Sequence, residues 1–194
     1  MALNGHPKLR IGEVGCGDMG ADKADSLGKN FLGIDISLTA MRRAQKVHSM
    51  ANFIVADAKA LPLRDGALDF LLCVNTLPVI GFDLYPALVE MGRVTNSYIS
   101  LNLMSRQVAH REFEDYKWID TDRSLLGIFY MDREKTVCDC AFFYFDPAEA
   151  EVMMKEMGFK SIHAADVVTG DGLPMVWVDA AKQENPAGFQ QPCE

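Results

Sequence analysis

A short glycine-rich run, GCGDMG at residues 15–20, follows an apolar stretch near the start of the chain. Glycine has no Cβ, so it permits a tight turn, a close approach of backbone to ligand and exposed amide groups. The spacing G-x-G-x-x-G between a strand and a helix is typical of loops that bind nucleosides or nucleotides. Nicotinamide and flavin enzymes also use it, and a purely structural turn is the alternative.

Two carboxylates accompany this run. Asp35 ends the next apolar stretch, where an acidic group can accept hydrogen bonds from ribose hydroxyls. Its alternative role is to cap a helix, although Ser37 is available as the cap. Glu13 precedes the glycines and could face a cationic amino-acid group instead of an anionic pyrophosphate. A paired structural carboxylate is the alternative for Glu13.

Asn75 and Thr76 follow a nearly continuous apolar stretch, as expected after a parallel strand buried on both faces. Ligands of parallel sheets collect at the carboxyl ends of the strands, so both residues are candidates for an active site. An ordinary polar loop is the alternative. No general base is evident, although His110, Tyr116, Tyr130 and Tyr85 could approach a substrate. The catalytic residues therefore stay unassigned.

The elements needed to position these residues follow from the pattern of apolar residues. Strands are expected at 9–14, 31–36, 52–56, 69–74 and 98–103. Helices are expected after the glycine run, from the N-cap Ser37 to about residue 46, and over 84–94. This alternation predicts an α/β fold: a Rossmann-like three-layer sandwich with a mostly parallel sheet.

The second half of the chain departs from this alternation. Residues 106–136 mix charged and aromatic side chains without one periodicity, which predicts an inserted helix and hairpin. A strand at 140–145, a helix opening at Asp146-Pro147 and an antiparallel C-terminal hairpin over 159–180 follow. We therefore expect one domain over residues 1–182, with the insert at about 106–136, and a flexible tail over 183–194.

Four sequence motifs resemble those of class I S-adenosylmethionine-dependent methyltransferases, in the order found in that family. IGEVGCGDMG resembles the first, with Glu13 before the loop of Gly15, Cys16 and Gly17, and FLGIDIS resembles the second, with Asp35 and Ile36. VADAKALPLRDGALDFLLCVNTL is similar to the third and fourth.

The resemblance implies that Asp57 and Ala58 contact adenine and that Asn75 lies at the sheet edge by the cofactor. Asp57 could instead cap the turn that follows it. FFYFDPAEAEVMMKEMGF is similar to the late region of the small-molecule branch of the family. The implied cofactor is S-adenosylmethionine, with S-adenosylhomocysteine as product. Because almost nothing precedes the first strand, a homodimer or a partner subunit could cover the cofactor.

Composition narrows the choice of partners. The formal net charge of −8 over 194 residues opposes nucleic-acid binding, which requires clustered basic residues. No apolar run reaches membrane-spanning length and no secretory signal is evident, so we expect no membrane association and a cytoplasmic location. Cys138-x-Cys140 lacks a second pair of cysteine or histidine ligands, so no metal site is expected.

Methyl transfer to an oxygen, nitrogen or carbon atom of a small molecule is the function predicted from the motifs. A catalytically silent module that binds the same cofactor is an alternative, and an NAD-dependent oxidoreductase is a weaker one. The oxidoreductase would need a catalytic pair such as tyrosine and lysine, which the sequence does not offer at a typical spacing. The aromatic residues of the insert could line an acceptor pocket or form the insert's own core.

Overall fold

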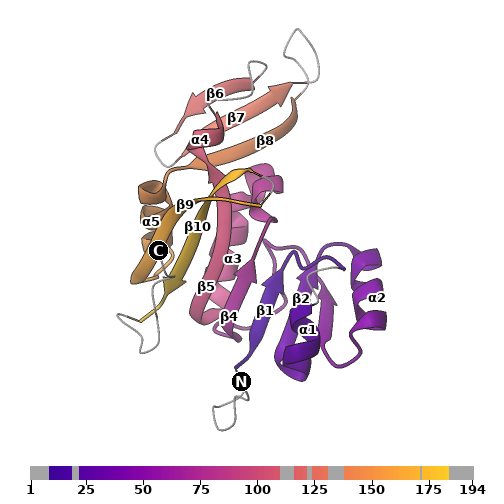
Figure 1. The fold of residues 1–194 in the computed structure, drawn as a ribbon. Helices are drawn as coiled ribbons and strands as arrows, with labels where there is room; N and C mark the ends of the chain where they lie inside the picture. Colours follow the sequence, from indigo (N-terminus) through magenta and orange to yellow (C-terminus); the bar gives the residue numbers. More distant parts are fainter. Residues whose placement is uncertain are drawn as a thin grey trace.

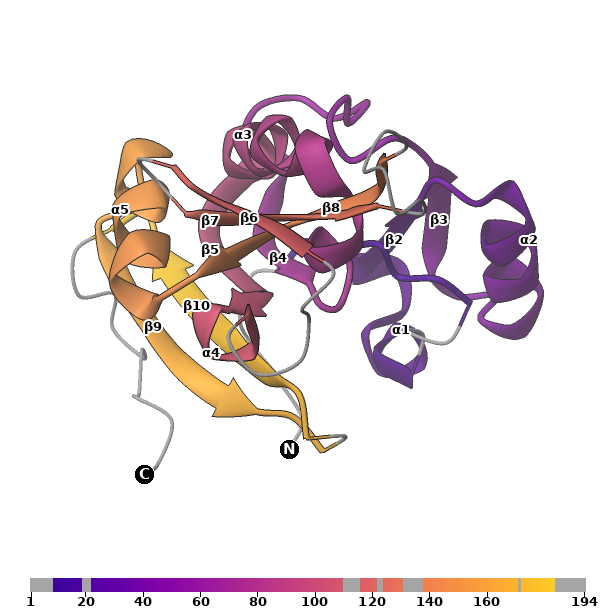
Figure 2. The same cartoon turned by 90° about the horizontal axis from the view of Figure 1, so that it is seen from above.

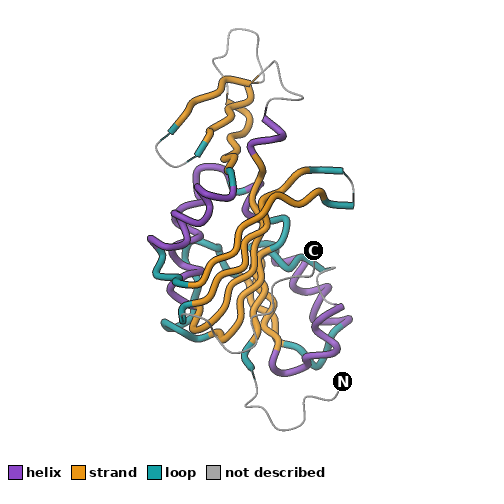
Figure 3. Tube along the Cα trace, turned by 60° about the vertical axis from the view of Figure 1, so that its left-hand side comes forward, coloured by secondary structure: helices purple, strands orange, loops and turns teal. Residues whose placement is uncertain are grey.

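A computed structural model describes residues 9–18, 22–109, 116–121, 124–130, 138–170 and 172–183. A central β-sheet carries helices on both faces, as the view along the sheet in Figure 3 shows. The strands of its parallel half are β1 (Ile11–Val14), β2 (Phe31–Asp35), β3 (Asn52–Val55), β4 (Leu68–Cys73) and β5 (Thr95–Ser105). They lie in the order β3-β2-β1-β4-β5 (Figure 1).

Five α-helices accompany the strands in the described part of the chain. They are α1 (Asp22–Leu27), α2 (Leu38–Val47), α3 (Leu84–Val94), α4 (Arg106–Ala109) and α5 (Pro147–Glu156). Ser37 is the N-cap of α2 as predicted, because its hydroxyl accepts a hydrogen bond from the Ala40 amide at 3.2 Å. Asp146 and Glu149 form a capping box at the start of α5.

The antiparallel C-terminal hairpin is confirmed as β9 (Ser161–Val168) and β10 (Pro174–Ala181). β10 pairs with β5 over Tyr98 to Met104, so the sheet continues in the order β5-β10-β9. The Rossmann-like fold with a mostly parallel main sheet is therefore confirmed. The core lies between this sheet and the helices, and includes the fully buried Leu71 and Leu101.

An antiparallel extension of the same sheet projects beyond the end of β5 (Figure 1, and from above in Figure 2), and we call it the small sheet. It consists of β6 (Tyr116–Asp120), β7 (Leu125–Tyr130) and β8 (Cys138–Phe145), which pair in antiparallel fashion. The helix and hairpin expected over 106–136 are present as α4 with β6 and β7. The strand expected at 140–145 belongs to the same small sheet, and only Met104 and Ser105 join β8 to β5.

The limits of β5 differ most from the expected ones. The sequence predicted a strand over 98–103, whereas β5 extends from Thr95 to Ser105. Its start is displaced because α3 runs directly into the strand, where the buried Thr95 hydroxyl donates to the Met91 carbonyl at 2.7 Å. Its end is displaced because residues 104 and 105 pair with β8. Both limits of β5 thus depend on neighbouring elements, α3 and β8, and not on the apolar centre of the strand, from which it was predicted.

Candidate functional site

The glycine loop forms a sharp turn at the carboxyl end of β1. Gly15 and Gly17 have φ angles of 74° and 56°, which favour glycine, and the Gly15 amide donates to the Ile34 carbonyl at 2.7 Å. A Cβ on Gly15 would lie 1.9 Å from Oγ1 and 2.6 Å from Cβ of Thr76. Gly15 is thus required by both its conformation and its close contact with the loop after β4. Gly20 lies outside the described residues.

Asp35, at the end of β2, organises the opposite side of the turn. One carboxylate oxygen accepts the Gly17 amide at 3.0 Å, and the other accepts the Ser37 amide at 2.8 Å. A carboxylate oxygen can accept more than one hydrogen bond, so this arrangement leaves acceptor capacity for ribose hydroxyls. Asp35 therefore both holds the loop and faces the space in front of it.

Glu13 and two cysteines lie beneath the loop. Glu13 and Cys16 are each only 5% exposed, and Cys73 is fully buried. Burial, together with the negative charges of Asp35 and Glu13, raises the pKa of Cys16 to about 12. The Cys16 Sγ lies 4.0 Å from Met41 Sδ of α2, so this side chain packs beneath the loop and its backbone alone can contribute to a site.

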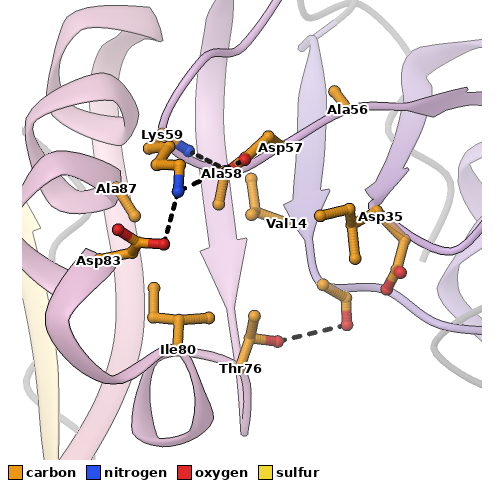
Figure 4. Close-up of a pocket in the computed structure, with 12 residues that line it drawn as sticks. Val14, Asp35, Ala56, Asp57, Ala58, Lys59, Thr76, Ile80, Asp83 and Ala87 are labelled. Carbon is orange, nitrogen blue, oxygen red and sulfur yellow. Dashed lines mark hydrogen bonds and ion pairs between the residues drawn. The ribbon is translucent and has the colours of Figure 1, made fainter.

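A cavity of about 260 Å³ opens in front of these residues, at the carboxyl ends of the first three strands (Figure 4). Its lining is Val14, Gly15, Asp35, Ile36, Ala56, Asp57, Ala58, Lys59, Thr76, Ile80, Asp83 and Ala87. We call it the first cavity. The structure therefore brings together five of the predicted residues: Gly15, Asp35, Ile36, Asp57 and Ala58.

Negative charge predominates in the first cavity. Asp35, Asp57 and Asp83 line it with one cation, Lys59, among the described residues. The Lys59 ammonium lies 2.5 Å from Asp83 Oδ2 and 3.8 Å from Asp57 Oδ2, and the Asp83 hydrogen bond raises the pKa of Lys59 (Figure 4). Such a lining favours a ligand with a cationic centre and disfavours a pyrophosphate.

Asp57 also makes the turn contact that was its alternative role. Its Oδ1 accepts the amide of Lys59 at 3.0 Å, while Oδ2 faces Lys59 Nζ. Lys59, Ile80 and Asp83 line the first cavity although they were not predicted from the sequence. Adjacency to Asp57-Ala58 could have indicated Lys59, but only the packing of the loop before α3 brings Ile80 and Asp83 to the cavity.

A second cavity, of about 250 Å³, lies on the other side of the loop after β4. Its lining is Asn75, Pro78, Val79, Met104, Phe142, Thr169, Leu173 and Met175. Asn75, which was predicted to bind cofactor, is thus placed in the second cavity, while its neighbour Thr76 lines the first. Consecutive residues of one loop therefore line the two cavities.

Asn75 is held by an exchange of hydrogen bonds with Asn102 of β5. The Asn75 amide donates to Asn102 Oδ1 and Asn102 Nδ2 donates to Asn75 Oδ1, each at 2.7 Å. Asn102 is 1% exposed, and Asn75 has a φ of 56°, a left-handed conformation that asparagine tolerates better than most residues. This pair fixes the loop between the two cavities.

Of the four candidate proton acceptors, Tyr85 is the one whose side chain the structure describes. The Tyr85 hydroxyl lies 3.3 Å from Ser124 Oγ, and its ring packs edge-on against Phe143, which joins α3 to the small sheet. Trp118 packs against Tyr144 in a cluster of the small sheet. His110 and the side chains of Tyr116 and Tyr130 lie outside the described residues.

Among the described helices, none has the length and apolar character needed to cross a membrane. Within the same described residues, no cluster of three or more histidine, cysteine or acidic side chains is arranged to hold a metal ion.

The fold is that of class I S-adenosylmethionine-dependent methyltransferases. It is similar to an S-adenosylmethionine-dependent methyltransferase from Mesorhizobium loti, with a TM-score of 0.65 and 16% identity over 91% of this chain and 93% of that one. It is also similar to magnesium protoporphyrin IX methyltransferase from Synechocystis PCC 6803 with bound S-adenosylhomocysteine. The TM-score is 0.62, and the sequence identity is 14% over 91% of this chain and 75% of that one.

A model of the methyltransferase domain matches residues 12–98, the segment that contains the glycine loop, Asp35, Asp57 and Asn75. The predicted resemblance to S-adenosylmethionine-dependent methyltransferases is thus confirmed by domain and fold. A (4+2)-cyclase has the same fold as well, with a TM-score of 0.60 and 15% identity over 90% of this chain and 75% of that one. No curated protein matches the sequence.

Proposed function

We propose that this protein transfers the methyl group of S-adenosylmethionine to an oxygen, nitrogen or carbon atom of a small molecule. The observation that carries the proposal is the first cavity: a glycine turn closed by Asp35, with a lining in which carboxylates outnumber the single lysine. These residues fit a nucleoside that carries a cationic sulfur. They fit the anionic pyrophosphate of NAD poorly, because three carboxylates would oppose it.

Every residue predicted to bind the cofactor except Asn75 has a place in this proposal. Asp35 would accept hydrogen bonds from the ribose hydroxyls, and Ile36, Asp57 and Ala58 would contact the adenine. The backbone of the glycine loop, above the buried Glu13, would hold the methionine part. The bound cofactor supplies a methyl group on a positively charged sulfur, which is reactive enough that alignment with a nucleophile can suffice. A dedicated base is therefore not required.

A module that binds the cofactor without transferring its methyl group is the second candidate, because a (4+2)-cyclase shows that this fold also serves a protein named for another reaction. Fold alone does not determine the reaction, so binding and turnover have to be measured separately. Cofactor binding without methyl transfer across a broad library of acceptors would establish the silent module. Methyl transfer to any small-molecule acceptor would eliminate it.

Calorimetric titration tests the cofactor. We expect S-adenosylmethionine and S-adenosylhomocysteine to bind and NAD to show no heat of binding. Asp35→Asn should weaken S-adenosylhomocysteine binding about 10- to 100-fold, because hydrogen bonds to a charged group contribute roughly 1.5 to 3 kcal/mol. The matched control is Asp65→Asn, since this exposed aspartate pairs with Arg93 at the amino end of the sheet. Binding of NAD alone, or equal affinities of the two variants, would refute the proposed site.

A further inference from the structure

We propose that the second cavity receives the methyl acceptor and that this acceptor is a neutral, mostly apolar small molecule with a hydrogen-bond-accepting group at the Asn75 end. The inference rests on the proposed function, whose site it extends from cofactor to substrate. Its physical basis is the chemistry of the cavity lining, the volume of the cavity and the hydrogen-bonding state of Asn75.

The lining determines the polarity of the ligand. None of the eight lining residues carries a charge. Six of them are apolar: Pro78, Val79, Met104, Phe142, Leu173 and Met175. The Thr169 hydroxyl, one of the two polar groups, donates to the Leu173 carbonyl at 2.8 Å. A charged ligand would lose its hydration here without gaining an ionic partner from these residues, which is costly. The first cavity, with its four charged residues, has the opposite character.

The volume sets the size of the ligand. An apolar cavity of roughly 150 Å³ holds one benzene molecule, so a cavity of about 250 Å³ accommodates a larger group, such as two fused rings. It is smaller than pockets for drug-sized ligands, which begin at about 300 Å³. The acceptor, or the part of it that enters the cavity, is therefore small.

Asn75 supplies the polar contact, and its orientation follows from its partner. The Asn75 backbone amide is a donor, so the atom of Asn102 that it meets must be the side-chain oxygen. Asn102 Nδ2 then donates to the Asn75 side-chain oxygen. This leaves the two N–H groups of Asn75 Nδ2 as donors, with no hydrogen bond to the described residues. They can donate to an oxygen of the acceptor, whose second lone pair stays available for the attack on the methyl carbon.

The position of Asn75 next to Thr76 places this polar contact beside a residue that lines the first cavity. A lone pair of the acceptor atom forms the new bond to the methyl carbon while the carbon–sulfur bond breaks, and that electron pair stays on sulfur. Sulfur thereby becomes a neutral thioether, and the proton of the acceptor O–H passes to solvent water. By holding the acceptor atom, Asn75 aligns it with the methyl group.

Two aromatic probes test the cavity, both titrated into the protein saturated with S-adenosylhomocysteine. We expect 1-naphthol to bind, and 1-naphthoate, which has the same rings and a negative charge, to bind at least tenfold more weakly. Leu173→Trp should fill the cavity and weaken 1-naphthol binding at least tenfold while S-adenosylhomocysteine binding stays within twofold. The control is Val168→Trp, because Val168 is 69% exposed on β9 and does not line the cavity.

A third measurement isolates the polar contact. Asn75→Gly keeps the left-handed backbone but removes the donor, so it should weaken 1-naphthol severalfold and leave naphthalene binding unchanged. No binding of 1-naphthol to the wild-type protein, equal binding of naphthol and naphthoate, or no effect of Leu173→Trp would each overturn the inference. Failure of S-adenosylhomocysteine to bind would refute the proposed function instead, and 1-naphthol titrated without it would still test the cavity.

Discussion

At the scale of residues, one contact couples the loop after β1 to the loop after β4. Gly15 lies so close to Thr76 that a methyl group at position 15 would overlap with the threonine Cβ itself, at 2.6 Å. A change of the Thr76 rotamer cannot relieve this overlap. The Thr76 hydroxyl, 3.4 Å from the Gly15 carbonyl, adds a hydrogen bond between the two loops.

Gly15→Ala should therefore destabilise the protein more than a glycine substitution that causes only backbone strain. The matched control is Gly28→Ala, because Gly28 has a φ of 52° and no atom within 4 Å of an added Cβ. We expect Gly28→Ala to cost about 1 to 2 kcal/mol of unfolding free energy. Gly15→Ala should cost roughly 1 to 3 kcal/mol more, from overpacking. Urea denaturation measures both; equal losses would show that Thr76 does not confine Gly15.

Sequence alone predicted the residues whose role depends on their position at a strand end. Asp35 was predicted because it ends an apolar run, and the parallel sheet brings such ends to one edge, whereas Asp57 was predicted from the resemblance to the methyltransferase motifs. Asn102 could not be identified, because nothing local marks an asparagine within an apolar strand as the partner of Asn75. The same holds for Asp83, which reaches the first cavity only through the packing of the loop before α3.

At the scale of elements, Arg106 joins the small sheet to the main domain. Its guanidinium pairs with both carboxylate oxygens of Glu149 on α5, and the distance from Nε to Oε2 is 2.8 Å. Its Nη1 lies 3.1 Å from Oδ1 of Asp120 in β6. The hydrogen bonds to Glu149, with a smaller one to Asp120, raise the pKa of Arg106. Glu149 also accepts the Asp146 amide, so the capping box of α5 belongs to the same network.

Arg106→Ala should lower the free energy of unfolding by about 1.5 to 3 kcal/mol, because it removes charge-assisted hydrogen bonds from the partly buried Glu149. Asp120→Ala should cost less than about 1 kcal/mol, since Asp120 is largely exposed and such pairs contribute little. Urea denaturation of the two variants provides the comparison. An Arg106→Ala effect as small as that of Asp120→Ala would mean that the junction adds no stability.

The elements themselves were well predicted where the sequence has strong periodicity, as in α2 and α3. The small sheet was predicted less completely, because its strands pair mainly with each other and lack the continuous apolar runs of the buried parallel strands. β8 belongs to the small sheet because it pairs with β7, and the periodicity of a segment does not encode which strand it pairs with.

At the scale of the whole molecule, burial of titratable groups makes stability depend on pH. Burial raises the pKa values of Cys16 and Cys73 to about 12, whereas the pKa of a cysteine thiol in the unfolded chain is about 8.5. The folded state therefore retains these protons at pH values where the unfolded chain loses them. Their contribution is present in full below about pH 8.5 and is lost as the pH rises toward about 12.

We expect the free energy of unfolding to fall between about pH 8.5 and pH 11, by up to about 1.4 kcal/mol per pH unit for each thiol. The double variant Cys16→Ala, Cys73→Ala should show a shallower fall over the same range. Urea denaturation at several pH values measures both slopes, and the other cysteines are common to the two proteins. Identical slopes would mean that neither thiol resists ionisation in the folded state.

The two cavities have neighbouring lining residues at Asn75 and Thr76, but most of their other lining residues come from different parts of the chain. The first cavity is lined entirely by residues 14–87, whereas five of the eight residues around the second lie between 104 and 175. Those five positions are Met104, Phe142, Thr169, Leu173 and Met175. A combinatorial library confined to them would reshape the second cavity while every residue lining the first stays as it is. The chain thus offers a compact route to redesigning the ligand preference of the second cavity without rebuilding the first.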